Sequence, residues 1–172
     1  MEVNDVLHEM FDRLPGIVRR AVDGLGPDQL ASQPADGANS IAWLIWHLAR
    51  VQDGHIAELI DEEQVWVTGA WAAQFGLSAD PSNTGYGHDA EEAAAVRPEG
   101  SESLVAYYDA MAMRTMSYLA NLDAADLDRV VDDSWDPPVT LGARLISVAS
   151  DDLQHAGQAG YARGLLEREA QS

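Results

Sequence analysis

Four long segments of this chain repeat apolar residues at intervals of three and four, which is the spacing of one face of an α-helix. The segments run from about Asn4 to Asp23, Ser40 to Asp61, Ser101 to Asn121 and Thr140 to Glu169. No segment alternates apolar and polar residues for long enough to predict a strand. The pattern therefore predicts an all-α protein built on four helices.

Local signals place the ends and breaks of these helices. Pro15 lies inside the first segment and predicts a kink or a break, because a proline in a helix interior removes a backbone hydrogen bond. Ser40 precedes the second segment and is suited to cap the helix N-terminus. These two residues therefore predict a break in the first helix and the start of the second.

About 40 residues separate the second and third helices. Within them, Val65 to Phe75 predicts a short helix, and Asp89 with Glu92 predicts a capping box at the start of another. The residues from Gly76 to His88 are typical of a loop. A connection of this length predicts a four-helix bundle with a long crossover between helices 2 and 3.

Composition limits the classes of protein. A length of 172 residues suits one domain, residues 1–172. The absence of cysteine excludes disulfides and thiolate ligands, so a metal would need His, Asp or Glu. A net charge of −19 argues against nucleic acid and anionic membranes as partners. With no signal sequence at Met1 and no apolar run long enough to span a bilayer, we expect a cytoplasmic protein.

Asp151 and His155 carry the functional prediction. They lie four residues apart in a helical segment, so they share one helix face and can converge on one point. His47, in another apolar helix, offers a third donor. Two histidines and one carboxylate with an open position are typical of a catalytic metal site. Asp152 points about 100° further round the helix, away from this point.

Spacing leaves alternatives open. His47 and His55 are separated by eight residues, about 12 Å along a helix, so one of them is not a ligand of the same ion, and the spacing does not say which. A hydrogen-bonded His/Asp pair without metal fits the pattern equally well. His88 lies in a glycine-flanked loop, which predicts either a lid over a site or an exposed loop residue.

Small residues form a band on the last helix. Glycine is unfavourable in a helix interior, so the band predicts a close approach, most simply by a neighbouring helix, otherwise by a dimer partner or a ligand. Its members are Ala156, Gly157, Ala159, Gly160 and Gly164.

Longer strings carry a family resemblance. The strings SIAWLIWHLARVQDGH (40–55) and VTLGARLISVASDDLQHAGQAGYARGLL (139–166), with DPSNTGYGH and WDPPVT, resemble the DinB-like superfamily. Within it, they are similar to an actinobacterial branch of unknown function and to the N-terminal domain of mycothiol-dependent maleylpyruvate isomerases. The resemblance covers most of the chain.

The resemblance implies a four-helix bundle, commonly a homodimer, that binds a divalent metal, zinc or nickel. It implies that the ligands are His47, Asp151 and His155, which selects His47 over His55. Many relatives have histidine at the position of Asp151, and the isomerases have glutamate. The isomerases also carry a further C-terminal domain, which has no counterpart before Ser172, so we do not expect isomerase activity.

The function implied is that of a metal-dependent thiol S-transferase. The metal would lower the pKa of a small-molecule thiol such as mycothiol, and the thiolate would attack an electrophile. The alternative is a non-enzymatic dimeric bundle that holds a structural metal or sequesters a small ligand. The candidates for lining the pocket are Trp46, Tyr86, His88, Trp135, Arg144 and Arg163.

Overall fold

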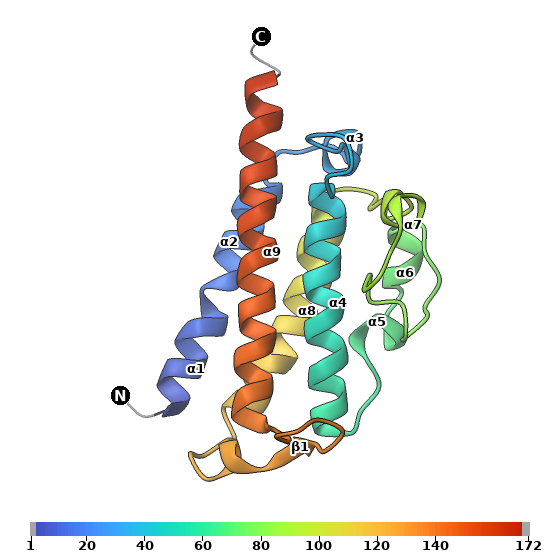
Figure 1. Ribbon diagram of the computed structural model, residues 1–172. Helices are drawn as coiled ribbons and strands as arrows, with labels where there is room; N and C mark the ends of the chain where they lie inside the picture. The colour runs from blue at the N-terminus through green and yellow to red at the C-terminus, as the bar shows by residue number, and fades with distance from the viewer. Residues whose placement is uncertain (1–2, 170–172) are drawn as a thin grey trace.

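The computed structural model describes residues 3–169, which form a four-helix bundle (Figure 1). Two consecutive helices, α1 (Val3–Asp12) and α2 (Leu14–Val22), make up its first arm. The other arms are α4 (Ile41–Ile60), α8 (Ser101–Leu119) and α9 (Leu141–Glu169). The predicted all-α class is confirmed.

Both predicted boundary signals are present. The chain breaks between α1 and α2 at Arg13, and Pro15 lies in the first turn of α2, where a proline removes no helical hydrogen bond. The side chain of Ser40 accepts a hydrogen bond from the backbone N–H of Trp43 and so caps α4.

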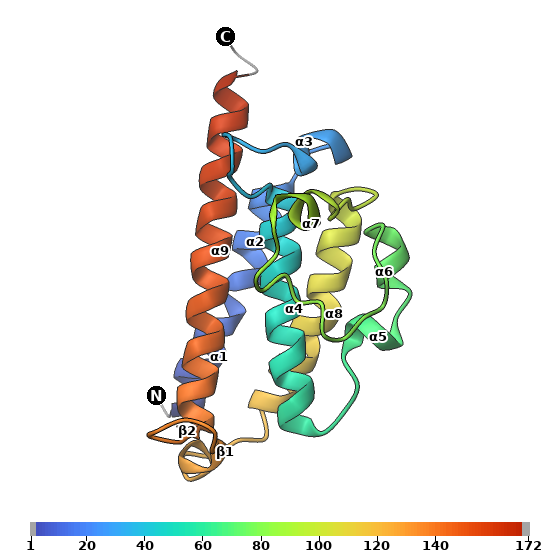
Figure 2. The same cartoon turned by 45° about the vertical axis from the view of Figure 1, so that its right-hand side comes forward.

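The crossover determines the direction of the third arm. Figure 1 and Figure 2 show that α4 and α8 run in the same direction, while α2 and α9 run against them. The chain must therefore return along the length of α4 before α8 can begin. This return carries α5 (Val65–Thr68), α6 (Trp71–Gln74) and α7 (Ala90–Ala94), and it lies against the outer side of α4. The predicted long crossover is confirmed.

Details of the crossover differ from the prediction at one point. The single short helix expected from Val65 to Phe75 is two helices, because the backbone at Gly69 is extended, with φ −96° and ψ 170°. The predicted capping box is present: Asp89 accepts from the N–H groups of Glu91 and Glu92, and Glu92 accepts from the N–H of Asp89.

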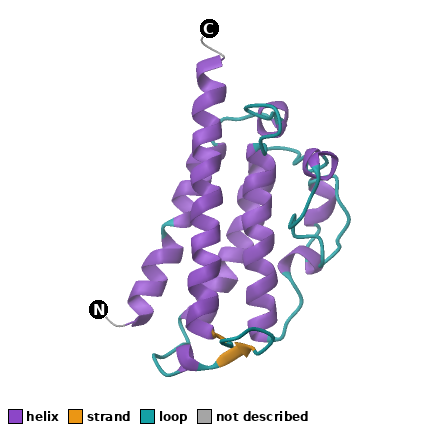
Figure 3. Ribbon diagram, in the orientation of Figure 1, coloured by secondary structure: helices purple, strands orange, loops and turns teal. Residues whose placement is uncertain are grey.

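Three short elements lie outside the sequence prediction. They are α3 (Pro27–Ala31), a 3₁₀ turn (Asp126–Asp128), and a small antiparallel hairpin of β1 (Val130–Asp132) and β2 (Val139–Thr140), drawn in orange in Figure 3. The hairpin closes the end of the bundle where α9 begins. Strands of three and two residues are too short to produce a period-two pattern, so the expectation of no strand was wrong here.

A buried ion pair fastens the crossover to the bundle. Asp53 on α4 is fully buried; its carboxylate accepts from the N–H groups of Val65 and Trp66 at 2.9 and 2.8 Å and from the Tyr107 hydroxyl at 2.9 Å. Arg50, also fully buried, lies 3.6 Å from the same carboxylate. One side chain of α4 therefore holds the start of α5 and the middle of α8.

The small-residue band of α9 is only partly packed. Ala156 and Ala159 are fully buried, as a helix contact requires. A Cβ atom added at Gly157, Gly160 or Gly164 would meet nothing within 4 Å in residues 3–169. The helix-packing interpretation is therefore wrong for the glycines, which lie on an open face of α9.

Membrane insertion finds no support in the helices. Among residues 3–169, no helix combines the length and the apolar character needed to cross a bilayer.

Replacing Asp53 tests how much the buried ion pair stabilises the protein. Asp53→Asn removes the carboxylate charge and leaves the buried charge of Arg50 without its counterion. We therefore expect the free energy of unfolding in urea to fall by about 3–5 kcal/mol. The matched change Asp109→Asn breaks a surface pair with Arg19 and should cost less than about 1 kcal/mol. Equal effects of the two substitutions would contradict this account.

Candidate metal centre

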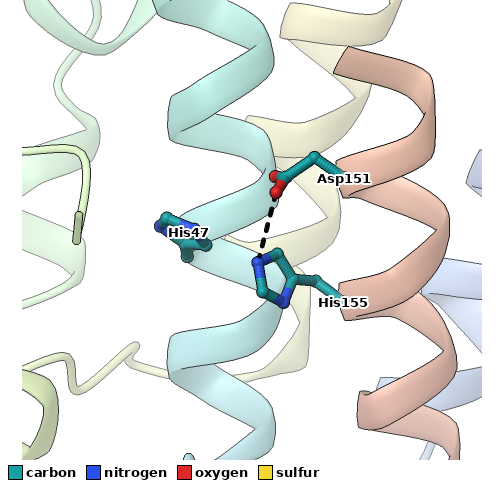
Figure 4. A group of neighbouring side chains, drawn as sticks. All are labelled: His47, Asp151 and His155. Atoms are coloured by element: carbon teal, nitrogen blue, oxygen red, sulfur yellow. Dashed lines mark ion pairs between the residues drawn. The ribbon is translucent and has the colours of Figure 1, made fainter. Parts of the chain in front are cut away.

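Three side chains from two helices converge on one point. His47 projects from α4, and Asp151 and His155 project from successive turns of α9 toward it (Figure 4). Each offers one ligand atom, and these atoms all lie within 4.8 Å of one another. The His155 Nε2 atom lies 3.6 Å from an Asp151 oxygen. The convergence expected from the sequence is thus present.

The spacing of these atoms fits one cation after a small contraction. Ligands bonded at about 2.1 Å to a tetrahedral ion lie about 3.4 Å apart. Side-chain rotations that move the ligand atoms by about 1 Å would bring the three atoms to that separation. The second oxygen of Asp151 is buried and has no hydrogen-bond partner within residues 3–169. An unpaired buried carboxylate oxygen is costly, and a cation would compensate it.

A backbone carbonyl fixes the orientation of His47. Its Nδ1 atom lies 2.6 Å from the carbonyl oxygen of Thr84 in the crossover loop. A carbonyl only accepts, so Nδ1 carries the proton and Nε2 keeps its lone pair for a metal. Burial, the largest cause, lowers the pKa of His47 and favours the neutral ring that a ligand requires. Trp43 stacks on that ring at 4.5 Å.

His155 is oriented in the same way from its own helix. Its Nδ1 atom lies 3.3 Å from the Gln158 side-chain oxygen, and because that oxygen only accepts, Nδ1 carries the proton. The other ring nitrogen, Nε2, faces Asp151. Both histidines of the cluster thus use one ring nitrogen in a hydrogen bond and present the other. This arrangement is typical of histidine ligands in metal proteins.

Arg50 holds the loop that contacts His47. Its guanidinium donates to the backbone carbonyls of Asp80, Pro81 and Asn83 at 3.2, 3.1 and 3.1 Å. The next residue is Thr84, whose carbonyl accepts from His47. A fully buried side chain one turn from His47 therefore positions the acceptor that orients it.

Gly85 brings the same loop against the ring of His47. Its φ of +90° is readily adopted only by glycine. A Cβ atom there would lie 2.8 Å from His47 Nδ1 and 2.9 Å from the ring of Trp46. The close approach of the loop to His47 therefore depends on glycine at this position.

His88 serves the loop and is no ligand. Its Nδ1 accepts from the indole N–H of Trp43 at 3.2 Å, and its Nε2 lies 2.8 Å from the Asn83 side-chain oxygen. The ring also stacks on Trp46 at 5.7 Å. Both nitrogens are engaged, so the expectation of an exposed loop histidine was wrong; the residue fastens the loop to α4.

Comparison with known proteins identifies the family. A family model described as mycothiol S-transferase matches residues 6–168. The chain belongs to the mycothiol S-transferase family. The chain is similar to a conserved protein from Enterococcus faecalis of known crystal structure, with 32% sequence identity and a TM-score of 0.88. The match covers 96% of this chain and 98% of the Enterococcus faecalis chain. No curated protein matches the chain. The resemblance to the DinB-like superfamily is confirmed.

A cavity of about 640 Å³ adjoins the cluster in this S-transferase family member. His47 and Asp151 line one end of it, and His55 and Glu58 lie further along α4. His55 therefore shares the cavity with His47 but is not part of the converging group. The choice of His47, which spacing left open, agrees with this geometry. The other lining residues are Val51, Gly54, Gln64, Thr84, Tyr86, Ser147 and Val148.

Only part of the predicted pocket lining is found at this cavity. Tyr86 lines it, and Arg144 contacts His55 at its edge. Trp46 is fully buried in the core. Arg163 donates to carbonyls at the end of α2, and Trp135 is 67% exposed in the hairpin turn. The assignments of Trp46, Trp135, Arg163 and His88 to the lining were wrong, because helix and loop positions alone do not show which way a side chain points.

Asp152, which the sequence places away from the converging point, is fully buried. Burial, with the neighbouring charge of Asp151, raises the pKa of Asp152 well above its usual range. The signal was present in the sequence: Asp152 continues the core stripe of α9 between Val148, Ala149 and Ala156 at helical spacing. Aspartate is rarely fully buried, so this helical spacing alone did not predict its burial.

Two glycines of the loop provide a matched test of the centre. Gly85→Ala should lower the affinity for zinc by about ten- to a hundredfold, because the new Cβ atom displaces the His47 ring and its carbonyl partner. Gly87 also has a positive φ, +78°, but nothing lies within 4 Å of its Cβ position. Gly87→Ala should therefore strain the backbone and leave the affinity within about twofold. Affinities follow from competition with a chromophoric chelator; equal losses in both variants would contradict the role of Gly85.

Proposed function

We propose that this protein is a metal-dependent thiol S-transferase in which His47, Asp151 and His155 hold a divalent cation. The observation that supports this most directly is the convergence of three donors whose histidines are already oriented by other partners. Two nitrogens and one oxygen suit zinc or nickel. Three protein ligands leave at least one position open toward the cavity.

The chain's own residues account for binding and orientation at this site. The bound cation would supply positive charge that lowers the pKa of a thiol beside it. Trp43 and the crossover loop cover the His47 ring and limit the access of water from that side. The cavity between α4 and α9 gives a thiol and an electrophile room to meet at the cation.

The thiol we propose is mycothiol, which the description of the matching family supports. In the transfer, the thiol sulfur forms a bond to an electrophilic carbon of the second substrate. The leaving group of that substrate departs with the bonding electron pair, and the thiol proton passes to solvent. The electrophile is a small molecule that fits the remaining part of the cavity.

We propose that the protein acts as a homodimer through the outward face of α9. This face exposes large apolar side chains, and exposed apolar patches commonly mark interaction sites. They are Ile146, 58% exposed, Leu153, 40% exposed, and Tyr161, 71% exposed.

Metal analysis tests the proposed ligands. Protein purified without chelator or nickel resin should contain about one divalent ion per chain. His155→Ala removes one of three ligands and should lower the affinity by about a hundredfold or more. His8→Ala removes an imidazole on α1 and should leave the affinity unchanged. A wild-type protein that takes up no zinc or nickel would overturn the assignment.

Thiol turnover tests the proposed chemistry. The metal-loaded protein should conjugate mycothiol to a chromogenic alkylating electrophile, and both His155→Ala and chelation should remove this activity. The competing function is a non-enzymatic binder with a structural metal. In that case chelation would lower the melting temperature while the loaded protein consumes no electrophile.

A further inference from the structure

We propose that Glu58 and His55 form a subsite that selects the tail of the thiol, favouring an extended thiol with an uncharged or cationic tail over one that ends in a carboxylate. The inference rests on the proposed function, because it assumes that the sulfur lies at the candidate metal centre. Glu58 and His55 are not part of that centre.

The shape of the cavity separates the two ends of a bound thiol. Along α4 the lining runs from His47 through Val51 to His55 and Glu58. His55 lies about 12 Å along the helix from His47, and Glu58 about 16 Å. Val51 and Val148 line the stretch between, and they offer apolar contact without hydrogen bonds. A thiol reaches the far end only when its tail is about 10 Å long.

The charges of the lining disfavour an anionic tail. Asp151 and Glu58 are the charged residues among those that line the cavity in the described chain, and both are acidic. A divalent cation would compensate Asp151, which leaves Glu58. The nearby guanidinium of Arg144 is already paired with Asp132 at 2.8 Å. A carboxylate at this end would therefore meet the charge of Glu58.

His55 gives the far end a donor as well as an acceptor, because a neutral imidazole carries one N–H and one lone pair. Its Nδ1 atom lies 3.4 Å from the Arg144 guanidinium and 3.8 Å from a carboxylate oxygen of Glu58. Burial and the charge of Arg144 lower the pKa of His55, which keeps the ring neutral. An N–H donor beside a carboxylate acceptor suits a hydroxyl or amide, which can both accept and donate.

Matched thiols measure this selection directly. The long pair is N-acetylcysteinyl-diglycine as its amide and as its free carboxylate; the short pair is N-acetylcysteine amide and N-acetylcysteine. Each is titrated into the cobalt-loaded protein, and the sulfur-to-cobalt absorption band gives the dissociation constant. The variants are Glu58→Gln and, as a control, Glu63→Gln, which removes the same charge from an exposed residue outside the cavity.

The expected result is a preference for the long amide over the long carboxylate of roughly three- to tenfold in the wild type, modest because Glu58 is 68% exposed. Glu58→Gln should bring the ratio close to one, and Glu63→Gln should leave it unchanged. The ratio for the short pair should be the same in all three proteins. His55→Ala should weaken the long amide and leave the short amide unaffected.

Two failures can be told apart. If Glu58→Gln keeps the wild-type ratio for the long pair while both thiols still bind cobalt, the subsite is overturned and the thiol site stands. If the cobalt-loaded protein shows no sulfur band with any thiol, the proposed function fails, and the subsite fails with it.

Discussion

The buried pair of Arg50 and Asp53 joins the crossover and α8 to α4. Both side chains are fully buried on α4. Asp53 faces the start of α5 and the middle of α8, while Arg50 faces the carbonyls of the crossover loop. Leaving either charge buried without the other would be strongly unfavourable. The two together therefore fasten the crossover to the helix that carries His47.

This arrangement couples the fold to the candidate centre through a short chain of contacts. Arg50 fixes the loop, the loop presents the Thr84 carbonyl, and that carbonyl determines which nitrogen of His47 is free. His88 fastens the same loop from its other side through Trp43. The metal affinity of the site should thus depend on residues that do not touch the metal, as the orientation of histidine ligands generally does.

The two sides of the centre are built differently. On α9, Asp151 and His155 are placed by the helix itself, because a spacing of four residues puts them on one face. On α4, His47 is placed by the helix but oriented by a loop from elsewhere in the chain. A cavity opens between these two helices, so a molecule bound in it contacts both. The acidic lining of that cavity then bears on which thiol can extend along it.

The helical arms, the break near Pro15, the capping box at Asp89 and the convergence of Asp151 with His155 could be predicted from the sequence. Each depends on residues within a few positions of one another. Tertiary contacts determine the direction of the His88 side chain in the crossover and of the Trp46 side chain on α4, and they leave the glycines of α9 on an open face. Tertiary structure also gives Arg50 its role, because a buried charge is tolerated only where carbonyls from a distant segment accept its hydrogen bonds. Contacts between distant segments leave no local periodicity from which they could be predicted.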